Sequence, residues 1–238
     1  MNRYTLTRHL WRSSGLVVLW AGMLVLSLLV TGIVSLFKDI TISGWSAWVY
    51  ISPWYMLGMG IYVTAVHLPM YIEHGVTRRR CMPQALLFGL LLVTVGAALI
   101  TLGFGIERAL YAVVDWPQTL GESDDGLFTA ADQYGRIFLG FWLGFAIFLA
   151  VGAAIGAAFY RKAWGGLGGV LVIVLGLGLI SPAGLAGAAS FPTSRVVEAV
   201  AGQPSIALVV VSCVVAAVAA TGLTWGLVRD LPIRSSGN

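Results

Sequence analysis

Side chains that could ligate a metal ion gather in one short stretch of the chain. His67, Glu73 and His74 lie within about two helical turns of one another, so they could approach around a helix end. No HExxH motif or equivalent ligand cluster accompanies them. We therefore expect no metal site, and we interpret these histidines as ordinary residues near the end of a membrane helix.

The motifs of other chemistries are missing as well. The chain has no GxxxxGK[ST] phosphate loop, and it has no GxSG nucleophile followed by a histidine in a later apolar segment, as a rhomboid protease would need. We therefore expect that the chain is not an enzyme, binds no cofactor directly and does not hydrolyse ATP by itself.

A strongly basic turn is the most distinctive feature of the sequence. Its residues are Glu73, His74, Gly75, Val76, Thr77, Arg78, Arg79 and Arg80. Three consecutive arginines exceed what membrane orientation requires. Gly75 can end one helix with a positive φ, and Thr77 can cap another short turn. We expect residues 73–80 to form a compact knob that docks in a groove of a cytoplasmic partner.

The composition places this turn in a membrane protein. Of the 238 residues, 58% are hydrophobic and only 10% are charged, so a soluble fold would expose large apolar patches to water. The apolar runs are much longer than barrel strands of about 10 residues, which predicts an all-α integral membrane protein with one transmembrane domain over residues 1–238. Its six expected spans are 16–37, 53–73, 86–106, 137–159, 165–186 and 206–228, and Ser181 and Pro182 interrupt the fifth.

The distribution of basic residues predicts the orientation in the cell membrane. Ten of the 14 Lys and Arg residues share one side with both termini, which the positive-inside rule places in the cytoplasm. Trp45, Trp54 and Trp116 fall at the expected outer interface, where tryptophan is enriched. No basic face interleaved with aromatic residues is evident, so we expect no nucleic-acid partner.

The segment before the first span combines basic and apolar residues. Arg3, Arg8 and Arg12, together with Trp11, fit a helix that lies on the anionic cytoplasmic leaflet. A plain basic flank would explain the arginines equally well, but it would give Trp11 no role.

Glycines of the later spans recur four residues apart. The pairs are Gly140 and Gly144, Gly152 and Gly156, and Gly165 and Gly169. This spacing lets helix backbones approach closely. We expect the pairs to serve internal packing, with a dedicated subunit interface as the alternative.

The run Gly75-Val76-Thr77-Arg78-Arg79 after the second span resembles the coupling turn of permease subunits of type-2 ATP-binding cassette exporters. The length and span count are similar too. In that family an amphipathic helix precedes the first span and the outer segment between the last two spans re-enters the membrane, and residues 3–14 and 181–204 resemble these parts. The resemblance implies a homodimer or heterodimer of permeases bound to ATPase subunits, which would hold ATP and Mg.

Two functional hypotheses follow. In the first, the chain forms half of the translocation path of an ATP-driven exporter, and residues 73–80 couple it to the ATPase. Because every charged residue lies at or beyond an expected span end, energy for pumping would come from a partner. In the second, the chain is a non-transporting immunity or assembly factor. The Val, Leu, Ala and Gly of the spans suit lipids, hydrophobic drugs or peptides without choosing among them.

Overall fold

The computed structural model describes residues 5–75, 77–120, 127–160, 167–188 and 205–229. These residues form helices and connecting loops, and no strand occurs among them. Five helices are long and apolar enough to cross a membrane: Leu10–Val34, Ser52–Glu73, Arg80–Val113, Tyr134–Phe159 and Ile206–Arg229. The prediction of a helical membrane protein is confirmed at this level, and the count of six spans stays a prediction.

Helix α8 (Leu167–Leu185) supplies a shorter apolar stretch, Val172–Leu185. It continues through Ser181 and Pro182, where the sequence predicted an interruption. A proline removes one hydrogen bond and crowds the preceding turn, but membrane helices tolerate this where neighbours satisfy the backbone. Most of the expected re-entrant segment lies in residues 189–204, outside the described residues.

The first two described helices are joined at a glycine. Helix α1 (Thr5–Ser14) leads into α2 (Leu16–Val34) through Gly15, which has a φ of 60°. This left-handed conformation disfavours residues with a Cβ, so glycine fits the junction. The short helix α3 (Gly44–Val49) follows α2.

The second predicted span, 53–73, is a helix with a wider turn in its middle. It consists of α4 (Ser52–Tyr62), a π-helical turn η1 (Val63–His67) and α5 (Leu68–Glu73). Pro69 accounts for this turn, because it has no N–H to donate four residues back and its ring would crowd that carbonyl group.

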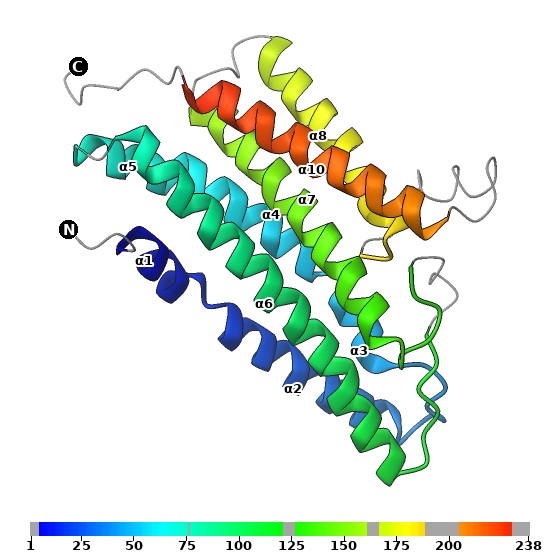
Figure 1. The fold of residues 1–238 in the computed structure, drawn as a ribbon. Helices are drawn as coiled ribbons and strands as arrows, with labels where there is room; N and C mark the ends of the chain where they lie inside the picture. Colours follow the sequence, from blue (N-terminus) through cyan, green and yellow to red (C-terminus); the bar gives the residue numbers. More distant parts are fainter. Residues whose placement is uncertain (1–4, 76, 121–126, 161–166, 189–204, 230–238) are drawn as a thin grey trace.

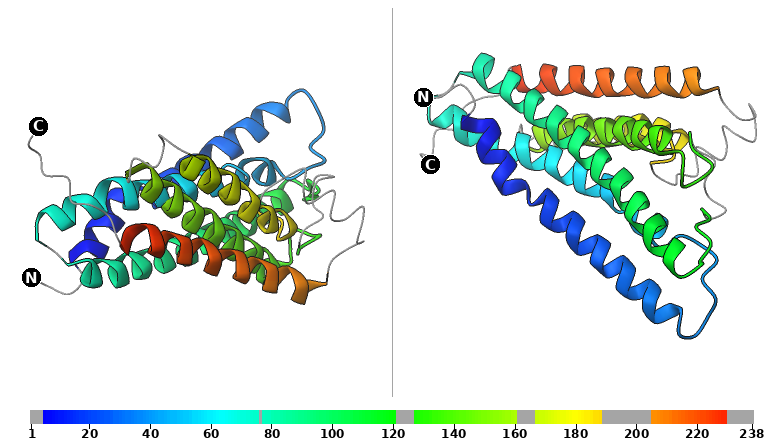
Figure 2. Two further views of the ribbon diagram at one scale, coloured as in Figure 1. Left: turned by 90° about the horizontal axis from the view of Figure 1, so that it is seen from above. Right: turned by 60° about the horizontal axis from the view of Figure 1, so that its bottom comes forward.

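Helix α6 (Arg78–Val113) is far longer than the predicted span 86–106. Its 36 residues extend over about 54 Å, against a hydrocarbon core of about 30 Å. Pro83 lies inside the helix, which already begins at the basic run. Figure 2 shows α6 crossing the bundle obliquely relative to α10. The prediction was too short because it followed apolar content, whereas the polar ends are helical too.

Helix α7 (Tyr134–Tyr160) lies at the centre of the bundle (Figure 1). Helices α4, α6, α8 and α10 (Ile206–Arg229) all pack against it. Phe141, Phe145 and Phe148 are completely buried along it. The end of the bundle opposite residues 73–80 is called the outer end below, following the predicted orientation.

Glycines allow the backbones of α4 and α7 to touch. A Cβ at Gly152 would overlap the carbonyl oxygen of Leu57, and one at Gly156 would lie 2.7 Å from the carbonyl oxygen of Ile61. The hydroxyl of Thr64 also donates to the carbonyl oxygen of Ala153 at 2.9 Å.

A second predicted glycine pair on α7 makes similar contacts. Gly140 lies against the carbonyl oxygen of Ala186, and Gly144 lies against the side chain of Ala188. The expectation of internal packing is therefore met for the two pairs on α7, whereas Gly165 lies outside the described residues.

Trp45 contradicts its predicted place at the outer interface. Its side chain is only 1% exposed, and its indole N–H donates to the carbonyl oxygen of Ile100 at 3.1 Å. Trp54 is half exposed, as an interfacial tryptophan would be. The sequence could not show which of these two tryptophans is buried, because Trp45 is buried only where α3 folds back into the bundle.

We expect Gly60→Ala to destabilise the protein, because the added Cβ would overlap the carbonyl oxygen of Leu149 and lie 2.7 Å from the amide nitrogen of Ala153. Overpacking costs about 1–3 kcal/mol, or roughly 2 to 4 °C in unfolding temperature per kcal/mol. Thermal unfolding in detergent measures this. Gly58→Ala is the matched control, since a Cβ there meets nothing within 4 Å. Equal unfolding temperatures for the two variants would show that α4 and α7 are not in backbone contact.

Candidate functional site

The candidate site is the turn that joins α5 to α6. After Glu73, the amide of His74 donates to the carbonyl oxygen of Met70 at 3.2 Å, and the amide of Gly75 donates to that of Ile72 at 2.9 Å. Gly75 has a φ of 79°. The prediction that Gly75 ends this helix with a positive φ is therefore confirmed. Val76 lies outside the described residues.

The basic run begins the next helix directly. Thr77 is the N-cap residue, with extended backbone angles, and its side chain makes no capping hydrogen bond. Its carbonyl oxygen accepts from the amides of Arg80 and Cys81 at 2.9 and 3.1 Å. The expected separate short turn is therefore wrong: Arg78 to Arg80 form the first turn of α6.

The turn combines exposure with uncompensated positive charge. Glu73, His74, Thr77 and Arg80 are exposed. The N-terminus of a helix has a partial positive charge, which an acidic residue in the first turn usually offsets, but α6 has none there. The arginines add further positive charge at this point. Such a surface can bind an anionic partner.

The segment before the first span packs beside this turn. The hydroxyl of Thr7 donates to the carbonyl oxygen of Gln84 at 3.3 Å, and Leu10 is completely buried. The side-chain amide of Gln84 in turn donates to the carbonyl oxygen of Arg80 at 3.3 Å. Helix α1 and the start of α6 therefore form one unit at the same end of the bundle (Figure 1).

Two faces of α1 differ as an amphipathic helix requires. Arg8 and Arg12 are exposed, whereas Trp11 is half-buried against the core. Arg3 lies outside the described residues. The plain basic flank therefore explains less than a packed amphipathic helix does, because Trp11 and its neighbours contact the rest of the chain.

The three possible metal ligands do not come together. His67 is buried in the π-helical turn, with its ring 4.6 Å from that of Tyr62, edge to face. Glu73, the last residue of α5, and His74, which follows it, are exposed. Within the described part of the chain, no group of three or more His, Cys, Asp or Glu side chains is placed to hold a metal ion.

The sequence missed a buried polar cluster at the outer end. Glu107 lies one residue past the expected span and is only 1% exposed. It shares one face of α6 with Gly103 and Tyr111, at four-residue spacing. This spacing of polar residues beside a glycine is the sequence signal that could have indicated the buried cluster. Its position just past an apolar run is also typical of an ordinary carboxylate at a span end.

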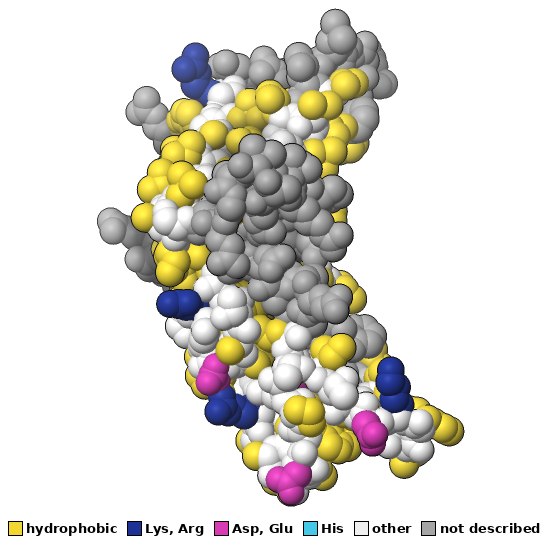
Figure 3. Space-filling model, turned by 90° about the vertical axis from the view of Figure 1, so that its right-hand side faces the viewer, with side chains coloured by type: hydrophobic (Ala, Val, Ile, Leu, Met, Phe, Trp, Pro, Cys, Tyr) yellow, Lys and Arg dark blue, Asp and Glu magenta, His cyan; other side chains and the backbone are white. Residues whose placement is uncertain are grey.

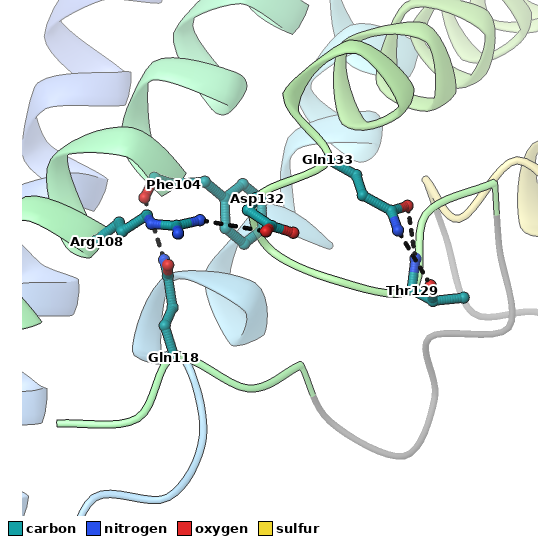
Figure 4. Close-up of polar contacts among 6 residues, drawn as sticks. All are labelled: Phe104, Arg108, Gln118, Thr129, Asp132 and Gln133. Carbon is teal, nitrogen blue, oxygen red and sulfur yellow. Dashed lines mark hydrogen bonds and ion pairs between the residues drawn. The ribbon is translucent and has the colours of Figure 1, made fainter.

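Exposed charges around this cluster are weakly paired. The guanidinium of Arg108 lies 3.6 Å from the carboxylate of Asp132, and both side chains are about half exposed (Figure 4). Such pairs contribute little to stability. In the space-filling view of this end, the acidic and basic side chains of the described residues are interspersed (Figure 3). The basic turn is therefore the stronger candidate for binding a charged partner.

Cysteine labelling tests which side of the membrane the turn faces. In a background with Cys81→Ala and Cys213→Ala, both native thiols being buried, we expect Thr77→Cys to react with an impermeant maleimide only after the cells are permeabilised. Asp39→Cys, in an exposed loop at the outer end, should react in intact cells. The reverse pattern would overturn the predicted orientation.

No protein-family model matches the chain, and comparison with the curated proteins and with the solved structures found no match either. The family resemblance of the basic turn therefore stays a proposal that depends on residues 73–80 and on the arrangement of the helices.

Proposed function

We propose that the chain is the membrane permease subunit of an ATP-driven exporter, and that residues 73–80 couple it to a separate ATPase subunit. The observation that carries this proposal is the exposed basic turn at the end of the α5–α6 hairpin. The turn has more positive charge than orientation requires, and the first turn of α6 contains no acidic residue that would offset it.

The helices around the turn support a mechanical role. Its two flanking helices continue into the bundle, where α4 touches α7 through glycines and α6 packs against both α1 and α7. Movement of the turn would therefore reach the central helix through rigid, closely packed elements. A turn that only fixed orientation would not need this connection.

The chain's own chemistry supports an external source of energy. It has no phosphate-binding loop, and within the described residues the best-buried carboxylate, Glu107, is held by hydrogen bonds at the outer end. The partner would supply ATP and Mg. A homodimer or heterodimer of permeases would complete the translocation path, with the substrate left open among lipids, hydrophobic drugs and peptides.

Charge reversal tests the proposal. We expect the double variant Arg78→Glu, Arg79→Glu to recover at least tenfold less of a P-loop ATPase on purification in mild detergent, because like charges would face each other across the interface. Arg136→Glu, an exposed arginine at the outer end, is the matched control and should recover the wild-type amount.

Two results would contradict the proposal. One is equal recovery of the ATPase with the double variant and with the control. The other is purification of the wild-type chain without any protein that contains a phosphate-binding loop, which would favour a non-transporting immunity or assembly factor.

A further inference from the structure

Helix α3 enters the outer half of the bundle without crossing it. Its six residues extend over only about 9 Å, yet Trp45 and Val49 are almost completely buried. The indole of Trp45 lies directly against Gly103 of α6, where a Cβ would overlap the ring. Backbone that does not span is tolerated at membrane depth only where protein surrounds it. Gly103 lies inside the expected span 86–106, so α3 reaches that depth.

Two tryptophans from neighbouring helices pack against each other in this region. The rings of Trp20 on α2 and Trp45 on α3 meet edge to face at 6.5 Å. The indole N–H of Trp20 donates to the carbonyl oxygen of Leu99 at 2.6 Å. At its start, α3 also meets α2 so closely that a Cβ at Gly44 would overlap the hydroxyl of Thr31. Helix α3 therefore fills the space between α2 and α6.

The carboxylate of Glu107 helps to hold the start of α3 in place. Glu107 accepts hydrogen bonds from the hydroxyl of Ser43, from the amide of Trp45 at 2.9 Å and from the side-chain amide of Gln118 at 2.9 Å. Gln118 also donates to the carbonyl oxygen of Phe104, a residue labelled beside it in Figure 4. Without the acceptor Glu107, the buried donors of Ser43 and Trp45 would be left unsatisfied, which costs free energy. Three of the bonds that join these segments to α6 thus end on one side chain.

Further contacts tie these loops to each other but not to α6. The amide of Ser43 donates to the carbonyl oxygen of Thr119 at 2.8 Å, and the hydroxyl of Thr119 donates to the carbonyl oxygen of Thr41. If Glu107 released them, the loops could move together with α3. Two further α6 groups hold this start. The hydroxyl of Tyr111 accepts from the amide of Gly44 at 3.2 Å, and the carbonyl oxygen of Ile100 accepts from the indole of Trp45 at 3.1 Å.

We infer that α3 is a plug in the outer half of the bundle and that Glu107 is the latch that keeps it closed. That α3 blocks a transport path rests on the proposed export function, since a path that leads outward must open at this end. The structural content of the inference, a helix that is released when Glu107 is replaced, is independent of the ATPase.

Thiol accessibility tests the latch. Ser46→Cys places a nearly isosteric thiol on buried α3, in the background with Cys81→Ala and Cys213→Ala. We expect Glu107→Ala to increase its rate of reaction with a membrane-impermeant thiol reagent, applied from outside, at least tenfold. Arg108→Ala changes the neighbouring exposed residue on α6 and should leave the rate unchanged.

Glu107→Gln gives a second form of the test, for use if the alanine variant does not accumulate. Glutamine keeps the shape of the side chain, but its NH2 group would face the groups that donate hydrogen bonds to Glu107. We therefore again expect faster labelling. An unchanged rate in a folded Glu107 variant would overturn the latch, as would rapid labelling with Glu107 intact. Recovery of the ATPase is measured separately, so failure of the latch and failure of the export proposal can be told apart.

Discussion

Helices α4 and α7 approach so closely that their backbones touch, and the other helices are arranged around this pair. In a membrane, lipid is as apolar as leucine, so helices associate through close packing and hydrogen bonds. Gly152 and Gly156 allow the close packing, and the hydroxyl of Thr64 donates a hydrogen bond to the carbonyl oxygen of Ala153. Since α6, α8 and α10 also pack on α7, their positions depend on this contact.

The two ends of the bundle use polar groups in opposite ways. At the outer end, the side chain of Glu107 is buried and its oxygens accept three hydrogen bonds, so this polar group serves the fold. At the other end, the first turn of α6 exposes positive charge that the described residues around it do not offset. The first arrangement is complete within the chain, whereas the second is suited to a partner.

Much of the helical arrangement was predictable from the sequence, because apolar content and length determine which segments can cross a membrane. The left-handed conformation of Gly75 was predictable too, since a glycine followed by a polar run commonly ends a helix. The length of α6 was not, because the helix continues through Pro83 into polar residues that hydropathy places outside the span.

Features that depend on contacts between distant segments were also beyond prediction. The burial of Trp45 requires the gap that Gly103 leaves on α6, 58 positions further along the chain. Glu107 follows an apolar run and resembles an ordinary interfacial carboxylate until α3 is placed beside it. For residues 73–80, the sequence indicated their exposure and charge, whereas their continuity with α6 and their link to α1 required the structure.

Photo-crosslinking from the turn in native membranes tests the central claim most directly. A photoreactive amino acid at position 77, which is exposed, should form a crosslinked product that mass spectrometry identifies as a protein with a GxxxxGK[ST] loop. The same amino acid at position 41, an exposed outer residue, should not. Crosslinks from position 77 to lipid alone, or to proteins without that loop, would contradict the account.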